Sequence, residues 1–308
     1  MGRILVTGGA GFIGSNIAKR LVELGHEVSV ADNLFLGRVS NLRGLKVKFY
    51  RMDLRDEKLT DKLFKKGKFE YVFHEAACSS APMFDKDPRH AVDVNVRGFM
   101  NVMQAATRGG VKRVVYASTS SIYHDLTPPH IETMIVTPKS FYTISKYLTE
   151  LCAKQYLDEY GLESIGMRYF SVYGPNELHK GRYANIISQF LWVMRKGQRP
   201  VIYGDGEQAR DFTYVDDVVD ANLRAMNGGK PGEVYNIGTG NVTTFNQVVE
   251  LLNLFLGKKI KPKYIPNPIH NYVPLTGASI EKARKELGFV SRYELKDGIE
   301  KLVGFYSK

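Results

Sequence analysis

A glycine-rich turn close to the N-terminus constrains the fold more than any other feature of this sequence. Residues 3–6 can form a strand, and residues 13–24 have the apolar spacing of a helix. Between and within them stand Gly8, Gly9, Gly11 and Gly14, which fit both GxGxxG and GxxGxxG. Glycines permit a tight turn and let the N–H groups of a helix start approach a pyrophosphate. In this context the motif predicts a dinucleotide site.

Strands and helices alternate through the first half of the chain. The pattern predicts strands at residues 3–6, 27–31, 47–51, 71–75, 114–118 and 162–168, with helices at 13–24, 59–66, 89–108 and 142–160. Such alternation implies right-handed crossovers around a parallel sheet. We therefore predict an α/β fold with a doubly wound parallel sheet of the Rossmann type.

Glycine and proline divide the second half into shorter elements. Helices are predicted at 185–195 and 246–256, a third begins near residue 280, and residues 234–237 form a strand. This pattern predicts a smaller α/β lobe that binds the substrate. We expect residues 1–170 plus about 211–240 to form the nucleotide-binding domain, and about 171–210 and 241–308 to form the lobe.

An acid ends the second predicted strand. Asp32 stands eighteen residues after Gly14. A carboxylate at this point accepts hydrogen bonds from the adenosine ribose hydroxyls and repels a 2′-phosphate. Asp32 therefore predicts NAD rather than NADP as the cofactor, although Arg38 nearby could weaken the discrimination.

A second acid follows the third predicted strand. Asp53 and Leu54 stand where a side chain could contact the adenine. The alternative for Asp53 is a simple helix cap, because acids at strand ends often serve that purpose.

A tyrosine and a lysine four residues apart carry the predicted chemistry. Tyr142 and Lys146 would lie one turn apart on the helix at 142–160. An ammonium beside a phenol favours the phenolate, which could then act as a general base. A hydroxyl-rich strand end at residues 118–121 could supply a hydrogen bond to the substrate oxygen and to the phenol. The alternative is an exposed pair on an amphipathic helix.

The order of motifs along the chain resembles the extended short-chain dehydrogenases/reductases. The shared motifs are TGGAGFIG at 7–14, DNL at 32–34, HEAA at 74–77, NVRG at 95–98 and YxxxK at 142–146. Within that family, RYFSVYGP at 168–175, GDGEQARDFTYVDD at 204–217 and NIGTG at 236–240 resemble nucleotide-sugar epimerases and dehydratases, UDP-glucose 4-epimerases in particular. The resemblance covers nearly the whole chain.

The resemblance implies a reaction and a set of site residues. The tyrosine would remove a proton from a sugar hydroxyl while hydride passes to NAD, and hydride would return to the other face of the keto sugar. The implied catalytic residues are Tyr142, Lys146, Thr119 and Asn95. The implied cofactor contacts are Gly8, Gly11, Phe12, Ile13, Gly14, Asp32, Asn33, Asp53, Leu54, Ala76, Ala77, Tyr142, Lys146 and Tyr169. The implied substrate contacts are Thr119, Tyr142, Ser171, Asn185 and Arg210.

Several positions depart from the family pattern and leave the substrate open. Ser171 stands where these enzymes usually carry asparagine, His124 replaces an expected glycine, and residues 266–272 lack an expected arginine. The stretches 78–80 and 179–181 resemble ADP-heptose 6-epimerases, whereas Asn185 resembles the UDP-hexose 4-epimerases. We expect a UDP-hexose 4-epimerase. The alternatives are an ADP-heptose 6-epimerase-like enzyme and a non-catalytic NAD-binding sensor or scaffold.

Composition limits the other classes of function. The chain has 308 residues and a net charge of +11, but no recognition motif accompanies the scattered lysines, so no nucleic-acid partner is predicted. Two cysteines and seven histidines without ligand spacing predict no metal site. No apolar run approaches the ~20 residues of a membrane span, so the protein is expected to be cytoplasmic. Apolar residues on several faces of 92–106 and 142–160 predict a homodimer.

Overall fold

The computed structural model describes residues 1–268 and 272–307. A seven-stranded parallel sheet forms its larger part, with strand order β3-β2-β1-β4-β5-β6-β9. This order confirms the predicted doubly wound fold, because β2 and β3 are added on one side of β1 and the later strands on the other side, beginning with β4. The strands are β1 (Arg3–Thr7), β2 (Glu27–Asp32), β3 (Val47–Arg51), β4 (Tyr71–His74), β5 (Arg113–Thr119), β6 (Glu163–Tyr169) and β9 (Val234–Ile237).

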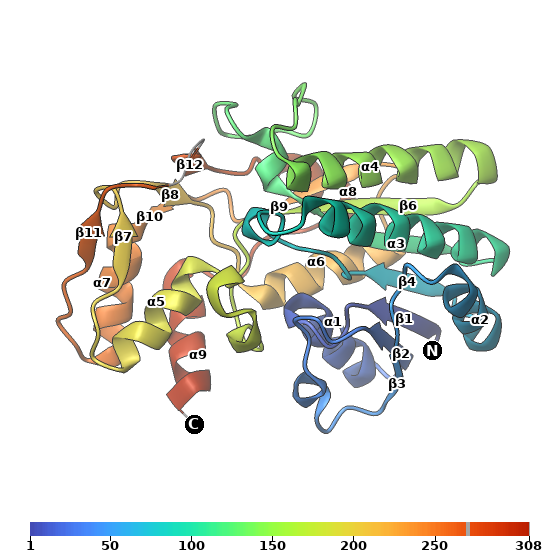
Figure 1. Ribbon diagram of the computed structural model, residues 1–308, viewed down its shortest axis with the longest axis horizontal. Helices are drawn as coiled ribbons and strands as arrows, with labels where there is room; N and C mark the ends of the chain where they lie inside the picture. Colours follow the sequence, from blue (N-terminus) through green and yellow to red (C-terminus); the bar gives the residue numbers. More distant parts are fainter. Residues whose placement is uncertain (269–271, 308) are drawn as a thin grey trace.

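Helices cover both faces of this sheet and bury its branched side chains (Figure 1). One face carries α1 (Phe12–Glu23), α6 (Val215–Asn227) and α8 (Glu281–Leu287). The other face carries α2 (Glu57–Gly67), α3 (Pro88–Arg108) and α4 (Phe141–Tyr160). The α8 segment was expected in the smaller lobe. It lies instead on the large sheet, where Ala283, Leu287 and Phe289 are buried in the core.

The smaller lobe lies at the other end of the molecule and has its own core (Figure 1). Three helices form most of it: α5 (Ile186–Arg195), α7 (Phe245–Leu256) and α9 (Leu295–Ser307). Its short strands are β7 (Val201–Tyr203) with β11 (Lys263–Ile265), and β8 (Ala209–Arg210) with β10 (Thr243–Thr244) and β12 (Leu275–Thr276). Short 3₁₀ turns are η1 (Val39–Leu42), η2 (Ala81–Met83), η3 (Ser120–Tyr123) and η4 (Leu178–Tyr183).

Local signals in the sequence set the limits of the two helices that flank the site. Ser140 caps α4 by accepting from the Thr143 N–H, and Gly161 ends this helix with φ 68°. In contrast, the N-cap residue of α1 is Gly11, which offers no side-chain hydrogen bond to the helix start. The N–H groups at the start of α1 are therefore available to a ligand.

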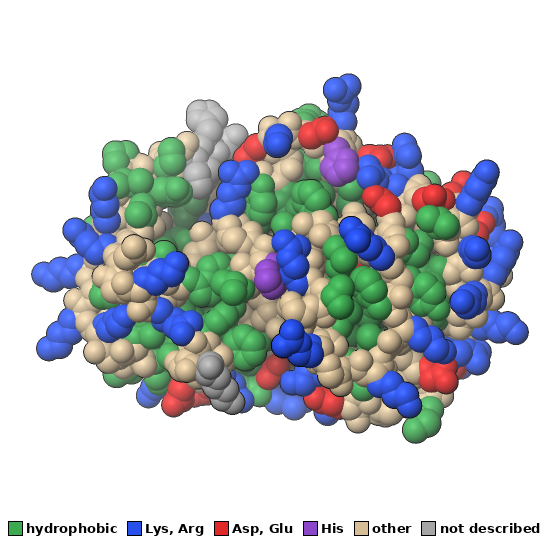
Figure 2. Space-filling model, turned by 60° about the horizontal axis from the view of Figure 1, so that its bottom comes forward, with side chains coloured by type: hydrophobic (Ala, Val, Ile, Leu, Met, Phe, Trp, Pro, Cys, Tyr) green, Lys and Arg blue, Asp and Glu red, His purple; other side chains and the backbone are tan. Residues whose placement is uncertain are grey.

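Charge is dispersed over the surface. Figure 2 shows Lys and Arg side chains scattered over the face drawn, with apolar and uncharged areas between them. Within residues 1–268 and 272–307, no helix is both long and apolar enough to cross a membrane. The same residues contain no group of three or more His, Cys, Asp or Glu side chains that could hold a metal ion.

Candidate active site

A long cavity follows the carboxyl ends of β1, β2, β4, β5 and β6. In the order of the strands, its lining passes from Asp53 after β3, through Asp32 and the glycine turn, to Thr119 and Tyr169 at the ends of β5 and β6. Most of the site residues predicted from the sequence line this cavity. They are Gly8, Gly11, Phe12, Ile13, Gly14, Asp32, Asn33, Asp53, Leu54, Ala76, Ala77, Thr119, Tyr142, Lys146, Tyr169 and Ser171. Open α/β sheets bind ligands at this edge.

The glycine turn is shaped by close backbone contacts. Gly8 has φ +64°, and a Cβ there would lie 2.6 Å from the backbone nitrogen of Ala76. A Cβ on Gly14 would lie 2.4 Å from the carbonyl oxygen of Gly8. No side chain fits at either position, so only glycine allows the backbone to pack this closely at the turn before α1.

Asp32 ends β2 with its carboxylate held by backbone donors. Oδ2 accepts from the Ala10 N–H at 3.0 Å, and Oδ1 accepts from the Leu34 N–H at 2.7 Å. Burial raises the pKa of Asp32, and the two backbone hydrogen bonds oppose this rise. The carboxylate is fixed beside the glycine turn with lone pairs left for further donors.

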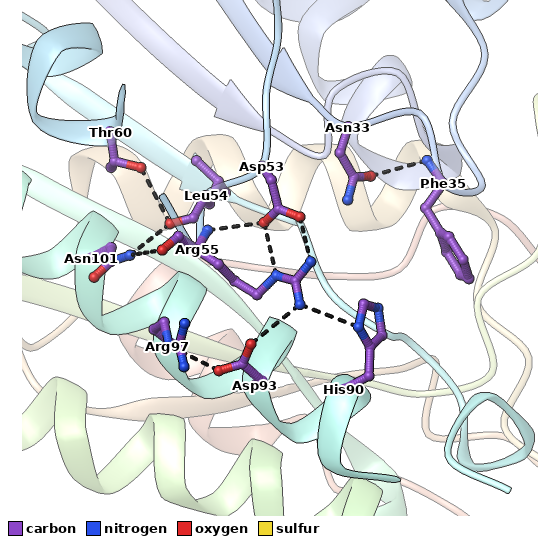
Figure 3. A network of polar contacts seen from close by, with 10 residues as sticks. All are labelled: Asn33, Phe35, Asp53, Leu54, Arg55, Thr60, His90, Asp93, Arg97 and Asn101. Atoms are coloured by element: carbon purple, nitrogen blue, oxygen red, sulfur yellow. Dashed lines mark hydrogen bonds and ion pairs between the residues drawn. The ribbon is translucent and has the colours of Figure 1, made fainter. Parts of the chain in front are cut away.

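Asp53 is held by a network of charged side chains (Figure 3). Arg55 donates to Asp53 from Nε at 3.1 Å and from Nη2 at 2.7 Å, and these bonds lower the pKa of that carboxyl. The Arg55 Nη1 atom donates in turn to Asp93 and to His90, both at 3.2 Å. The cap of α2 is Asp56, which accepts from the Leu59 N–H. Asp53 therefore does not cap α2. It lines the cavity, and the hydrogen bonds from Arg55 hold its carboxylate in place.

The three residues with the predicted chemistry lie together. Tyr142 and Lys146 lie on α4, and the Thr119 hydroxyl at the end of β5 lies close enough to the Tyr142 phenol to lower its pKa. The Lys146 ammonium donates to the carbonyl oxygen of Ala117 at 2.9 Å. All three side chains are buried, so the alternative of an exposed tyrosine–lysine pair is wrong.

The pKa values of Tyr142 and Lys146 differ from what their spacing in the sequence led us to expect. Burial raises the pKa of Tyr142 to about 12, against the opposing hydrogen bond from Thr119. Burial lowers the pKa of Lys146 to about 8, and Glu75 is the first of the groups that oppose this shift. Within the protein alone, desolvation of the phenol therefore outweighs the predicted stabilisation of the phenolate by the lysine.

Asn95, Asn185 and Arg210 are not among the described residues that line the cavity. Asn95 is buried and joins Cys78, through its N–H and carbonyl, to the Ser145 hydroxyl on α4. Asn185 caps α5 and donates from Nδ2 to the Ser171 carbonyl at 2.9 Å.

Arg210 lies in the smaller lobe against backbone carbonyls. Its guanidinium donates to the Val273 oxygen at 2.6 Å and to the Pro274 oxygen at 3.0 Å. The same group stacks on the rings of Phe245 and Tyr272 at 5.7 and 5.3 Å. Residues 269–271 of the stretch that departs from the family pattern lie outside the described residues.

Two positions that depart from the family pattern adopt left-handed backbone. His124 has φ 32° and Ser171 has φ 28°. Glycine and asparagine tolerate this region better than histidine and serine do. Both turns therefore have the positive φ that suits glycine or asparagine, although histidine and serine occupy these positions.

Sequence reasoning missed several residues of the cavity wall. Glu75 follows β4 directly and accepts from the Tyr169 hydroxyl at 2.9 Å. The position of Glu75 within the HEAA motif could have identified it as a residue of the site. Other missed residues of the cavity wall include Phe35, Cys78, Ser79, Ser80, His90, Asn176 and Lys180. Most of these come from loops, where no periodicity shows which way a side chain points.

Comparison with known proteins agrees with this geometry. A sequence profile of the NAD-dependent epimerase/dehydratase family matches residues 4–238. A putative UDP-glucose 4-epimerase of Methanocaldococcus jannaschii is 37% identical over 98% of this chain and 97% of its own length. A UDP-glucuronate 4-epimerase of Thermodesulfobacterium geofontis is 35% identical over 99% of this chain and 96% of its own length.

A solved structure of a related enzyme has a similar level of sequence identity to this chain. The UDP-glucose 4-epimerase of Thermotoga maritima, determined with UDP-glucose, superposes with a TM-score of 0.93 at 38% identity and covers 99% of this chain and 98% of its own. The family is NAD-dependent. The glycine turn, the uncapped start of α1 and the fixed Asp32 carboxylate are suited to binding NAD. This chain is a member of the NAD-dependent epimerase/dehydratase family.

Proposed function

We propose that this protein is an NAD-dependent UDP-hexose 4-epimerase that interconverts UDP-glucose and UDP-galactose. The observation that carries the proposal is the buried group of Tyr142, Thr119 and Lys146 at the end of a cavity that begins at the glycine turn. The similarity of the whole chain to UDP-hexose 4-epimerases supports this choice of substrate.

Each catalytic side chain has a separate task in this proposal. Tyr142 takes the proton of the sugar 4-hydroxyl, and Thr119 hydrogen-bonds the same oxygen and the phenol. Lys146 orients the nicotinamide ribose. Bound NAD accepts and returns the hydride, and its positive charge adds the stabilisation of the phenolate that Lys146 alone does not give. Residues 120 and 121 are serines rather than acids, so the chain lacks the carboxyl that a dehydratase uses there.

A substrate panel tests the proposal. Purified protein is incubated with UDP-, ADP-, GDP- and dTDP-sugars, and the products are separated by chromatography. We expect conversion of UDP-glucose and UDP-galactose to one equilibrium mixture from either side. Conversion of an ADP-heptose instead would favour the alternative enzyme. Binding of NAD with no conversion of any sugar would favour a sensor or scaffold.

Replacing Asp32 with asparagine should narrow the preference for NAD over NADP. The change keeps the side-chain size but removes the charge that repels a 2′-phosphate, so we expect a shift of at least tenfold, about 1.4 kcal/mol. Calorimetric titration with both cofactors measures it. Asp53→Asn is the control, because adenine is common to both cofactors and both affinities should change together. Tighter binding of NADP than NAD by the native protein would contradict the assignment.

Replacing Arg210 with alanine should weaken UDP binding much more than NAD binding. A guanidinium can make two charge-assisted hydrogen bonds to a diphosphate, so we expect about a tenfold to hundredfold loss. Arg199→Ala is a matched control, because Arg199 also donates to backbone carbonyls of the same lobe. Equal UDP affinity in both variants and the native protein would exclude Arg210 from the substrate site.

We further propose a homodimer formed through α3 and α4, which lie side by side on one face of the sheet (Figure 1). On α4, Phe141, Ile144, Leu148 and Leu151 are exposed at the spacing of one helix face. We expect light scattering to give a dimer, and Leu148→Glu to give a monomer. Leu254→Glu, at an exposed leucine of α7, should stay dimeric. A monomeric native protein would contradict this assembly.

A further inference from the structure

Glu75 is a carboxyl group in an unusual place. It follows β4 at the cavity wall, where its N–H donates to the Thr7 carbonyl at 3.1 Å and its side chain is only partly exposed. The next two residues, Ala76 and Ala77, are small and apolar. Placing a carboxylate here costs free energy, because a partly buried charge loses hydration. The proposed chemistry of Tyr142 does not use it.

The contacts of Glu75 fix its position without neutralising it. The Tyr169 hydroxyl donates to Oε1 at 2.9 Å, and Asn222 on α6 hydrogen-bonds the same hydroxyl. Among the described residues, no cation forms an ion pair with Glu75 within 4.0 Å. Burial raises the pKa of Glu75 to about 7, and the hydrogen bond from Tyr169 and then the positive charge of Lys146 oppose this rise. When ionised, Glu75 therefore places a negative charge at the cavity wall that no described ion pair balances.

The same end of the cavity must hold the nicotinamide. The hydride leaves the sugar carbon whose hydroxyl proton goes to Tyr142, so the acceptor ring must lie beside that tyrosine. Tyr142, Lys146 and Tyr169 line this end together with Glu75. The oxidised ring carries a positive charge, and the reduced ring carries none. The Lys146 ammonium disfavours the oxidised ring, whereas a carboxylate favours it.

We propose that Glu75 sets the redox balance of the bound cofactor by stabilising NAD⁺ relative to NADH. In the forward step the sugar carbinol loses a hydride to NAD⁺ and a proton to Tyr142, which gives the ketone and NADH. In the return step the same hydride and proton go back to the sugar. Glu75 favours the return, so that the enzyme finishes each cycle with NAD⁺. The consequence for turnover rests on the proposed function, whereas the effect on the cofactor does not.

Cofactor binding to Glu75→Gln tests the proposal. Glutamine keeps the size and an acceptor for the Tyr169 hydroxyl but removes the charge. We expect the ratio of NAD⁺ to NADH affinity to fall about tenfold, equivalent to about 30 mV in the two-electron potential of the bound cofactor. ADP-ribose, which lacks the nicotinamide, should bind the variant as it binds the native protein. Glu70→Gln, an exposed carboxyl at the other end of β4, should leave the ratio unchanged.

The pH dependence gives a second readout. Tyr142 and Lys146 from α4, Tyr169 from β6 and His74 from β4 are the titratable groups around Glu75. As pH rises through 7, ionisation of Glu75 should favour NAD⁺, and loss of the Lys146 proton acts in the same direction above its pKa of about 8. In Glu75→Gln the rise near pH 7 should be absent, and only the rise near pH 8 should remain.

Two results would overturn the proposal. One is an unchanged NAD⁺ to NADH ratio in Glu75→Gln with normal ADP-ribose binding. The other is a parallel loss of affinity for NAD⁺, NADH and ADP-ribose, which would make Glu75 a purely structural residue. These measurements use no sugar. A protein that shows the expected cofactor shift but converts no UDP-sugar would refute the proposed function and leave this inference standing.

Discussion

Replacing Tyr142 with phenylalanine is expected to lower turnover at least ~100-fold, within the usual range for removal of a general base. The ring and its burial against Phe84 and Cys78 are kept, so the cavity should keep its shape. NAD affinity should therefore change little. Steady-state rates on the substrate identified by the panel, together with calorimetry for NAD, measure the two effects separately.

A matched change isolates the hydroxyl chemistry. Tyr123→Phe removes another buried phenol, one that contacts Arg168 and Asn236 rather than Thr119. It should cost stability but leave most of the turnover. Near-native turnover in Tyr142→Phe would show that another group takes the proton, and the mechanism would then be wrong.

Replacing Glu150 with glutamine is expected to destabilise the fold by about 3–5 kcal/mol, because it leaves a buried arginine without its counter-ion. Glu150 lies two turns after Tyr142 on α4 and accepts from Arg168 at 3.0 and 2.7 Å, with both side chains almost fully buried. It also accepts from the hydroxyl of Ser118, next to Thr119. Chemical denaturation measures the loss.

A double variant separates the ion pair from packing. Changing both Glu150 and Arg168 to methionine should recover most of the lost stability, since buried pairs can be replaced by apolar residues at little cost. Glu281→Gln, which breaks an exposed pair with Arg284, should cost less than about 1 kcal/mol. A single Glu150→Gln variant as stable as the native protein would show that the pair does not hold α4 to the sheet.

Most of the large sheet could be predicted because its strands are short apolar runs between clear turns. The predicted strands at 47–51 and 234–237 have the observed bounds, and the others differ by one residue at one or both ends. Two helices were missed, α6 (Val215–Asn227) and α9 (Leu295–Ser307). The motif at 204–217 was interpreted only through its resemblance to nucleotide-sugar epimerases, so the start of α6 within it was not predicted. Helix α9 has no strong N-terminal signal in the sequence.

The cofactor end of the site was more predictable than the substrate end. Gly8, Gly14 and Asp32 have roles that follow from backbone geometry and charge at a known point of the fold. The positions of Arg55 and Glu75 in the site could not be predicted, because they depend on contacts with residues distant in sequence, such as Asp93 and Tyr169. The orientation of Arg210 depends on carbonyls more than sixty residues away. Spacing along the chain carries no information of that kind.

The pKa of Tyr142 shows a further limit of sequence reasoning. The spacing of Tyr142 and Lys146 indicated their common helix face but not how deeply α4 buries them. Burial raises the pKa of Tyr142 to about 12, so the base role that we propose for Tyr142 requires positive charge brought by the cofactor.

The fate of the hydrogen on the reacting carbon tests the central claim most directly. UDP-glucose carrying deuterium at C4 is converted by the protein, and the product is analysed by mass spectrometry and NMR while NADH absorbance is followed. If the hydride returns to the carbon that it left, UDP-galactose keeps the full label at C4 and NADH does not accumulate with turnover. Loss of the label to solvent, or release of one NADH for each product formed, would contradict epimerisation through a transient keto sugar.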